Sequence, residues 1–335
     1  MISNFGRAAP WSLGIEEELI LVDAETLETV PAFSRVVGDG DERIKPELFE
    51  CFVELATPVV PDADAARAAL QGLRDELGRR AQPHGIALHA AGTHALAHGQ
   101  GQPLVPVKRY ERLARELGDR IYLQLVAGLH VHVSLPDAES CLRTFEAIVP
   151  FLPTLLALSA NSPFAEGAHT GRRSERAERL LAMPTGGTPP TLADWDDWEA
   201  ATRGDSMRRH WDAWPRPEYG TLEVRVMDMQ TDVRRSAGFA EIVRALVVVL
   251  VDSAAETYDR ELYARRRAEA ATFPPDQAEV DALAALVEPA LDPAARHLAE
   301  TVLAGRPEAE RQLDVAAAQG LAAVPADVVA RTLAF

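Results

Sequence analysis

The sequence of 335 residues lacks the two glycine-rich loops that most often bind nucleotide phosphates. It contains no Gly-x-x-x-x-Gly-Lys-[Ser/Thr] segment and no Gly-x-Gly-x-x-Gly turn. These absences exclude the commonest nucleotide-binding loops, but they leave open a nucleotide site built on a β-sheet.

Positive charge and cysteine are also scarce. The chain has 51 Asp and Glu residues against 34 Lys and Arg residues, and its formal net charge of −17 argues against a nucleic-acid-binding surface, which needs basic patches. A few well-placed Arg residues can still bind an anionic nucleotide. The two cysteines, Cys51 and Cys141, are far apart in sequence and indicate ordinary thiols in a reducing compartment.

Long hydrophobic runs are lacking as well. The most apolar run, residues 245–251, is far too short to cross a bilayer, and the N-terminus shows no pattern of a signal peptide. We therefore expect a cytoplasmic protein without a membrane or nucleic-acid partner. With 47% apolar and 25% charged residues, the composition is that of a folded protein with one large domain or two ordinary ones.

The most informative segment is residues 13–22, Leu-Gly-Ile-Glu-Glu-Glu-Leu-Ile-Leu-Val. Its apolar flanks predict a buried strand, in which Glu16 and Glu18 share one face and Glu17 lies on the other. A buried, unpaired carboxylate is unfavourable, and a divalent cation bound by carboxylate oxygens is a common compensation. A solvated acidic edge strand is the alternative for this segment alone.

Three further segments combine an apolar face with a functional one. Their polar positions are Glu50 and Glu54 at the end of residues 45–58, His130, His132 and Ser134 in residues 128–135, and Thr221, Glu223 and Arg225 in residues 221–228. Four such strands predict an antiparallel sheet, with helices over its apolar face and a functional concavity on the other.

Apolar spacing predicts helices over residues 62–85, 110–125, 140–159 and 236–255, and a short strand over residues 86–91. Residues 166–205 are rich in Gly, Pro and charge, which indicates irregular connections around a short Arg-bearing helix. The remaining residues are Ala-rich and are predicted to be helical.

Carboxylates, histidine and arginine around one groove are the components of a metal-dependent phosphoryl-transfer site. Arg225 can bind a phosphate and neutralise the charge that develops on it. An ordinary ion pair between Glu223 and Arg225 on one strand face is the alternative, and it would contribute little if exposed.

Seven motifs occur in a fixed order along the chain. They are Gly-Ile-Glu-Glu-Glu at 14–18, Glu-Leu-Ala-Thr-Pro at 54–58, Gly-Thr-His at 92–94, Gly-Leu-His-Val-His-Val at 128–133, Ala-Leu-Ser-Ala-Asn-Ser-Pro at 157–163, Thr-Gly-x-x-Ser-x-Arg at 170–176 and Thr-Leu-Glu-Val-Arg at 221–225. Over residues 11–255 this series resembles the glutamate–cysteine ligase type 2 family, the YbdK-like carboxylate–amine ligases.

The resemblance implies an α+β protein with a glutamine-synthetase-like catalytic fold, in which helices cover the outer face of a curved antiparallel sheet. Residues 1–335 would form a single catalytic domain, with a family-like core at 11–255 and a divergent, Ala-rich helical C-terminal part at 256–335. The implied activity depends on ATP and Mg²⁺. It activates a glutamate-type amino-acid carboxylate as an acyl phosphate and joins it to an amine, such as cysteine, in a γ-glutamyl-type amide.

The resemblance also assigns roles to residues at the matching positions. Arg225 would contact the transferred phosphoryl group, with Glu223 beside it in catalysis, and Arg176 would contact phosphate or substrate. The implied metal ligands are Glu16, Glu18, Glu47, Glu54, His130 and Glu223, with Glu50 as a weaker candidate.

Two other functions remain open at this point. One is a guanidino-type phosphotransferase, since creatine-kinase-like enzymes share this sheet architecture, and the other is a catalytically silent relative that binds ligand. The expected partners are small-molecule substrates, and a homodimer is plausible from the frequency of dimers among soluble enzymes.

Overall fold

The computed structural model describes residues 3–38, 42–203, 210–253 and 258–334. Within these ranges, seven strands form one antiparallel sheet in the order β10-β11-β5-β1-β3-β2, and β4 also pairs with β1. The strands are β1 (Leu13–Asp23), β2 (Ile44–Pro46), β3 (Phe52–Ala56), β4 (Ile86–His89), β5 (Gly128–Ser134), β10 (Ala213–Arg216) and β11 (Thr221–Asp228).

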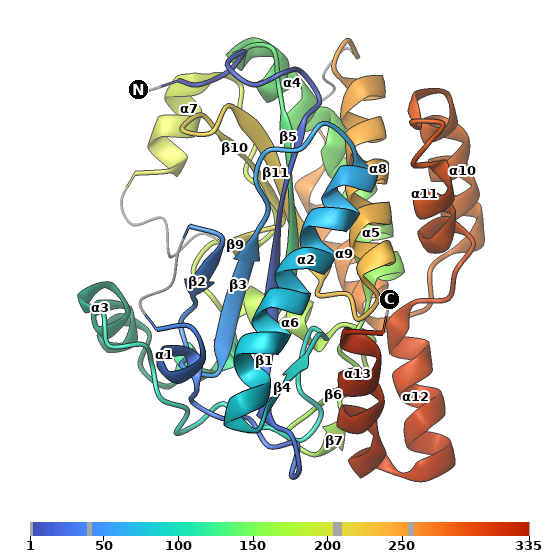
Figure 1. The fold of residues 1–335 in the computed structure, drawn as a ribbon. Coiled ribbons are helices and arrows are strands. Elements are labelled where there is room, and N and C mark those ends of the chain that lie inside the picture. The colour runs from blue at the N-terminus through green and yellow to red at the C-terminus, as the bar shows by residue number, and fades with distance from the viewer. Residues whose placement is uncertain (1–2, 39–41, 204–209, 254–257, 335) are drawn as a thin grey trace.

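One face of this sheet is covered by helices (Figure 1). The covering layer contains α2 (Ala63–Ala81), α4 (Ala138–Ile148), α5 (Leu152–Ser159) and α8 (Val233–Leu250), and α10 (Gln277–Val287) and α11 (Arg296–Leu303) pack against α8. The alternating apolar residues of β5 and β11 are fully buried beneath this layer: Leu129, Val131, Val133, Leu222 and Val224. The predicted α+β fold, with helices on the outer face of an antiparallel sheet, is confirmed.

The described part of the chain contains further helices and short strands. They are α1 (Phe33–Val36), α3 (Lys108–Leu117), β6 (Phe164–Ala165), β7 (Ala168–His169), α6 (Glu175–Leu181), β8 (Gly186–Gly187), α7 (Trp195–Ala201), β9 (His210–Trp211), α9 (Arg260–Thr272), α12 (Glu308–Gln319) and α13 (Val324–Thr332). The last two pack at the end of the sheet near β4, as the red ribbon in Figure 1 shows. In α12, the side chain of Gln312 donates to the Oδ1 of Asn161 at 2.7 Å, so the C-terminal part contacts the core specifically.

Three predicted helix boundaries need correction. The helix expected over residues 110–125 ends at Leu117, and residues 118–124 continue as a 3₁₀ helix from Gly118, whose φ is +56°. The helix expected over residues 140–159 is split into α4 and α5 by a 3₁₀ turn at Val149–Phe151, where Pro150 cannot continue the α-helical hydrogen-bond ladder.

The long helix α8 begins at Val233 because the side chain of Asp232 caps it by accepting from the amide of Arg234. It ends at Leu250, not at residue 255 as expected, and residues 254–257 lie outside the described ranges. The segment Ala138–Ser159 is apolar enough to cross a membrane by length and composition, but 78% of its most apolar window is buried within the fold. It is therefore best explained as core helices.

The three consecutive glutamates of β1 divide between the two faces of the sheet, as predicted. Glu17 points toward the helices and is fully buried against Arg74 of α2, whose Nη2 and Nε donate to its two oxygens at 2.7 Å each. Arg74 also donates to the backbone carbonyls of Gln230, Thr231 and Thr332, which lie before α8 and at the end of α13. This ion pair therefore ties β1 to two distant segments.

We expect Arg74→Ala to lower the free energy of unfolding by about 3–5 kcal/mol, because it leaves Glu17 charged and buried. Replacing both Arg74 and Glu17 with Leu should cost less than the single substitution, since no buried charge then remains. Urea unfolding followed by circular dichroism measures both effects.

The matched control is Arg143→Ala, because Arg143 pairs with Glu139 at the surface, where the Glu139 side chain is 85% exposed. That substitution should cost less than about 1 kcal/mol. A similarly small loss in Arg74→Ala would contradict the importance given to the buried pair.

Candidate active site

The uncovered face of the sheet carries a pocket whose side chains come from neighbouring strands. Glu16 of β1 is directly opposite His130 of β5, and His132 of β5 is directly opposite Glu223 of β11. Because side chains alternate along a strand, these four residues project from the same face. The structure therefore brings together polar side chains that lie far apart in the sequence.

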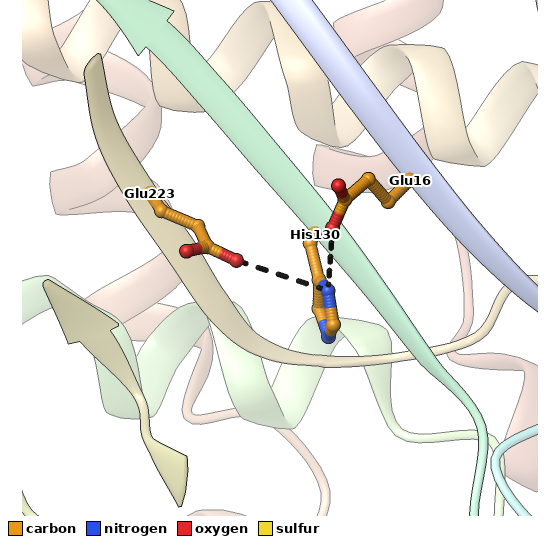
Figure 2. Close-up of side chains that lie close together, drawn as sticks. All are labelled: Glu16, His130 and Glu223. Carbon is orange, nitrogen blue, oxygen red and sulfur yellow. Dashed lines mark hydrogen bonds and ion pairs between the residues drawn. The ribbon is translucent and has the colours of Figure 1, made fainter. Parts of the chain in front are cut away.

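Glu16, His130 and Glu223 form the centre of this group (Figure 2). The Nδ1 of His130 lies 3.3 Å from Oε2 of Glu16 and 3.9 Å from Oε1 of Glu223. One ligand atom from each residue falls within 4.8 Å of the others, a spacing suited to a shared metal ion. Metal binding by these three residues stays a prediction.

The other predicted metal ligands line the same pocket. Glu18 accepts from the backbone amide of Gly128, and its Oε1 is 3.8 Å from Nε2 of His130. Glu54 pairs with Lys45 at 2.9 Å, and Glu47 lies in the same pocket wall. Four carboxylates therefore line the pocket, at Glu16, Glu18, Glu47 and Glu54.

Glu50, the weaker candidate, is the exception. Its predicted place on the same strand face as Glu54 is wrong. The strand β3 begins at Phe52, so Glu50 precedes the alternating segment. Its carboxylate accepts from the hydroxyl of Ser34 at 3.1 Å beside α1, and it does not line the pocket. The alternation of sequence between residues 50 and 55 gave no indication of the turn that separates Glu50 from the strand.

Crowding of carboxylates changes their proton affinity. Burial, together with repulsion by Glu18 and Glu54, raises the pKa of Glu47 to about 8. Burial and repulsion by Glu16 raise the pKa of Glu54 to about 7, although Lys45 opposes the shift. At neutral pH, Glu47 therefore favours the protonated state and Glu54 is close to half protonated, and positive charge that entered the pocket would favour ionisation of both.

Glu223 has the opposite electrostatic environment. Burial alone would raise its pKa, but Arg225, His132 and Arg216 outweigh burial and hold the pKa well below its usual range. Arg225 and Arg216 both donate to its carboxylate, as does the indole of Trp214 at 2.7 Å. Glu223 is therefore ionised and held in one orientation.

Arg216 and Lys45 were not predicted from the sequence. Arg216 lies over the rings of Trp214 and Tyr219, with its Cζ 4.7 and 4.8 Å from their centroids, in the short strand β10 that contains Pro215. Lys45 lies in the three-residue strand β2. Neither strand is long enough to show an alternating pattern, so the sequence carried no local signal for these cations.

Arg176 lies in the wall of the pocket, 4% exposed, near the start of α6. Its Nη1 donates to the carbonyl of Val226 and its Nη2 to the carbonyl of Arg225. The predicted contact with phosphate or substrate is untested, but these bonds show that backbone groups of β11 already engage the guanidinium.

Comparison with known proteins identifies the family. Residues 12–324 match the model of the glutamate–cysteine ligase family 2. A relative from Rubrobacter xylanophilus, named "Putative glutamate–cysteine ligase 2-3", is 34% identical over 274 residues, which cover 78% of this chain and 74% of the relative. The chain belongs to this family. It is an ATP-dependent carboxylate–amine ligase of the glutamate–cysteine ligase type.

A second family member, from Herpetosiphon aurantiacus, is 33% identical over 268 residues, or 76% of this chain and 70% of the relative. Solved structures agree on the fold. A glutamate–cysteine ligase from Francisella tularensis, in complex with AMP, superposes with a TM-score of 0.71 at 14% identity over 97% of this chain and 89% of its own. A bifunctional glutathione synthetase from Pasteurella multocida gives a TM-score of 0.72 at 15% identity over 97% of this chain, which spans about half (52%) of that longer protein.

The raised pKa of Glu47 predicts a pH dependence of stability. Because its pKa in the folded protein exceeds its ordinary value of 4.5, the folded state binds more protons, and stability falls as the pH rises from 4.5 towards about 8. In EDTA at pH 8, Glu47→Gln should therefore exceed the wild type in free energy of unfolding by about 1 kcal/mol or more, and this gain should vanish near pH 4.5.

Chemical unfolding at the two pH values measures this difference. Glu50→Gln is the matched control, since Glu50 lies outside the pocket. Equal stability of Glu47→Gln and the wild type at pH 8 would contradict the crowding of carboxylates described above.

Proposed function

We propose that this ligase phosphorylates a glutamate-type amino-acid carboxylate with ATP and Mg²⁺, and that an amine then attacks the acyl phosphate to form an amide. Phosphorylation is needed because a free carboxylate would have to expel oxide, whereas an acyl phosphate expels phosphate. The observation that carries the proposal is that Glu16, His130 and Arg225 line one pocket and that the buried Glu223 meets Glu16 and His130 beside it. The family membership and the AMP complex of the Francisella tularensis relative support it.

The residues present fit a divalent cation. Mg²⁺ prefers carboxylate oxygens, and Glu16, Glu18 and Glu223 supply them around His130. Burial and repulsion by neighbouring carboxylates raise the pKa values of Glu47 and Glu54, and a cation bound beside these two side chains would oppose that rise. Bound Mg²⁺ would screen the repulsion between the substrate carboxylate and the triphosphate.

Arg225 is the side chain that would bind the transferred phosphoryl group. Its guanidinium contacts Glu223, one of the candidate metal ligands. Its side chain lines the pocket and is 23% exposed. A planar guanidinium can donate two parallel hydrogen bonds to phosphate oxygens and neutralise charge that develops during transfer. Glu223 would orient this guanidinium while it serves as a metal ligand.

The walls of the pocket must also limit access of water, because water would hydrolyse the acyl phosphate before the amine arrives. Part of the pocket wall is aromatic and almost inaccessible to solvent. It consists of Phe49, Phe52 and Tyr110, each no more than 2% exposed. These walls are consistent with a reactive intermediate that is held until the second substrate attacks.

Purified protein with ATP, Mg²⁺ and a panel of amino acids and amines tests the proposed reaction. We expect release of ADP together with a product whose mass equals that of acid plus amine minus water. A stable phosphorylated guanidino compound would instead indicate a phosphotransferase, and no turnover with any pair would indicate a silent relative. Either result would overturn the proposal.

In the same assay, we expect Glu223→Gln and Arg225→Ala each to reduce kcat by at least about 100-fold, because each removes charge placed next to the transferred phosphoryl group. Both proteins should remain folded by circular dichroism. The matched control is Glu139→Gln, whose side chain is 85% exposed and which should keep wild-type turnover. Activity retained in both site variants would remove this pocket from consideration.

Direct titration with Mn²⁺ tests the metal site without turnover. We expect Glu16→Gln to weaken Mn²⁺ binding by at least about tenfold in isothermal titration calorimetry, since it removes a central carboxylate. Glu50→Gln should bind Mn²⁺ as the wild type does, because Glu50 lies beside Ser34 outside the pocket. Equal affinities of all three proteins would contradict the proposed ligand set.

A further inference from the structure

The strand β11 contains one extra residue where it passes the candidate metal site. Its register against β5 shifts between Val224 and Met227, so that Arg225 and Val226 together lie opposite His130 alone. Such a β-bulge bends the strand and changes the direction of its side chains. It also disrupts the ladder locally, so the backbone carbonyls there need other donors.

Arg176 supplies those donors. Its Nη2 donates to the carbonyl of Arg225 at 3.1 Å and its Nη1 to the carbonyl of Val226 at 3.3 Å, so one guanidinium bridges the two bulged residues. Gly128 of β5 lies against this guanidinium. A Cβ added at Gly128 would be 2.3 Å from Nη2 and 2.9 Å from Cζ, so only glycine leaves enough space for the bridge.

The helix that carries Arg176 is itself anchored to β11. The carboxylate of Asp228 accepts from the hydroxyls of Ser162 and Ser174 at 2.6 and 2.8 Å, and Ser162 Oγ accepts from the backbone amide of Arg176 at 3.2 Å. Because Asp228 follows the bulge on the same strand as Arg225, these contacts join the start of α6 to β11 both at the bulge and just after it.

We propose that Arg176 is a positioning residue for Arg225. By bridging the carbonyls of the bulge, it sets the direction from which the Arg225 guanidinium enters the pocket, where Arg225 also contacts Glu223. The role rests on the proposed function of Arg225 at the phosphoryl group. It differs from the direct phosphate contact that the sequence suggested for Arg176, because the two Nη atoms are engaged by backbone oxygens.

Two variants test this role from opposite sides. Arg176→Lys keeps the charge but cannot bridge two carbonyls in a fixed fork, and Gly128→Ala keeps Arg176 but displaces its guanidinium. We expect each to lower kcat by about 100-fold through misplacement of Arg225. The Kd for ADP with Mg²⁺ should stay within about threefold of the wild type, and the double variant should be no slower than either single variant.

Gly14→Ala is the matched control on the neighbouring strand. A Cβ at Gly14 would meet the Cβ of His132 at 3.6 Å, an ordinary contact, so this variant should keep wild-type kcat. A tenfold or greater loss of ADP affinity in Arg176→Lys, or kcat within about threefold of the wild type in both test variants, would overturn the positioning role.

Hydrogen exchange measured by mass spectrometry gives a readout that does not depend on turnover. If Arg176 holds the bulge, the peptide spanning residues 221–228 should exchange faster in Arg176→Lys and in Gly128→Ala than in the wild type and in Gly14→Ala. Unchanged exchange in both test variants would overturn the positioning role even if the enzyme proved inactive with every substrate pair. Faster exchange with no wild-type turnover would refute only the proposed reaction.

Discussion

The candidate site depends on carboxylates and cations that meet in one pocket on the uncovered face of the sheet. Four glutamates line the pocket, and Glu223 lies fully buried beside them. Lys45 pairs with Glu54, and Arg216 and Arg225 pair with Glu223, whereas burial and repulsion by neighbouring carboxylates raise the pKa values of Glu47 and Glu54. Carboxylate oxygens are ligands for a divalent cation and guanidinium groups bind phosphate, so this mixture of side chains suits a metal-bound nucleotide.

The same strand shows how the fold separates structural from functional charge. Glu17 has a single dedicated partner, Arg74, and both side chains are fully buried in the layer between sheet and helices. Glu16 and Glu18, one residue to either side, face the pocket, and both lie close to the ring of His130. Since alternation along a strand decides which face a residue occupies, a shift of one residue in β1 would bury two carboxylates without partners and expose the third.

Much of the sheet and of the candidate site could be predicted, because it depends on patterns within single segments of the sequence. Period-two alternation in β1, β5 and β11 correctly gave the faces of Glu16, His130 and Glu223. The features that could not be predicted depend on pairing between distant segments. These are the turn that removes Glu50, the cations contributed by the very short strands β2 and β10, and the buried partner of Glu17. The bulge in β11 belongs to the same class, because an extra residue exists only relative to the register of the neighbouring strand.

The bulge also gives a structural role to the motifs at residues 157–163 and 170–176, which contain no candidate metal ligand. Ser162 and Ser174, one from each motif, converge on Asp228 and place α6 so that Arg176 reaches the backbone of β11. Burial raises the pKa of Asp228, and the positive charge of Arg176 together with the hydrogen bonds from Ser162 and Ser174 opposes that rise. Residues that shape a strand can therefore be as closely tied to the site as those that face it. The spacing of Ser174 and Arg176 then follows from the backbone of β11. Ser174 must reach Asp228, while Arg176 must reach the bulge beside the candidate metal site.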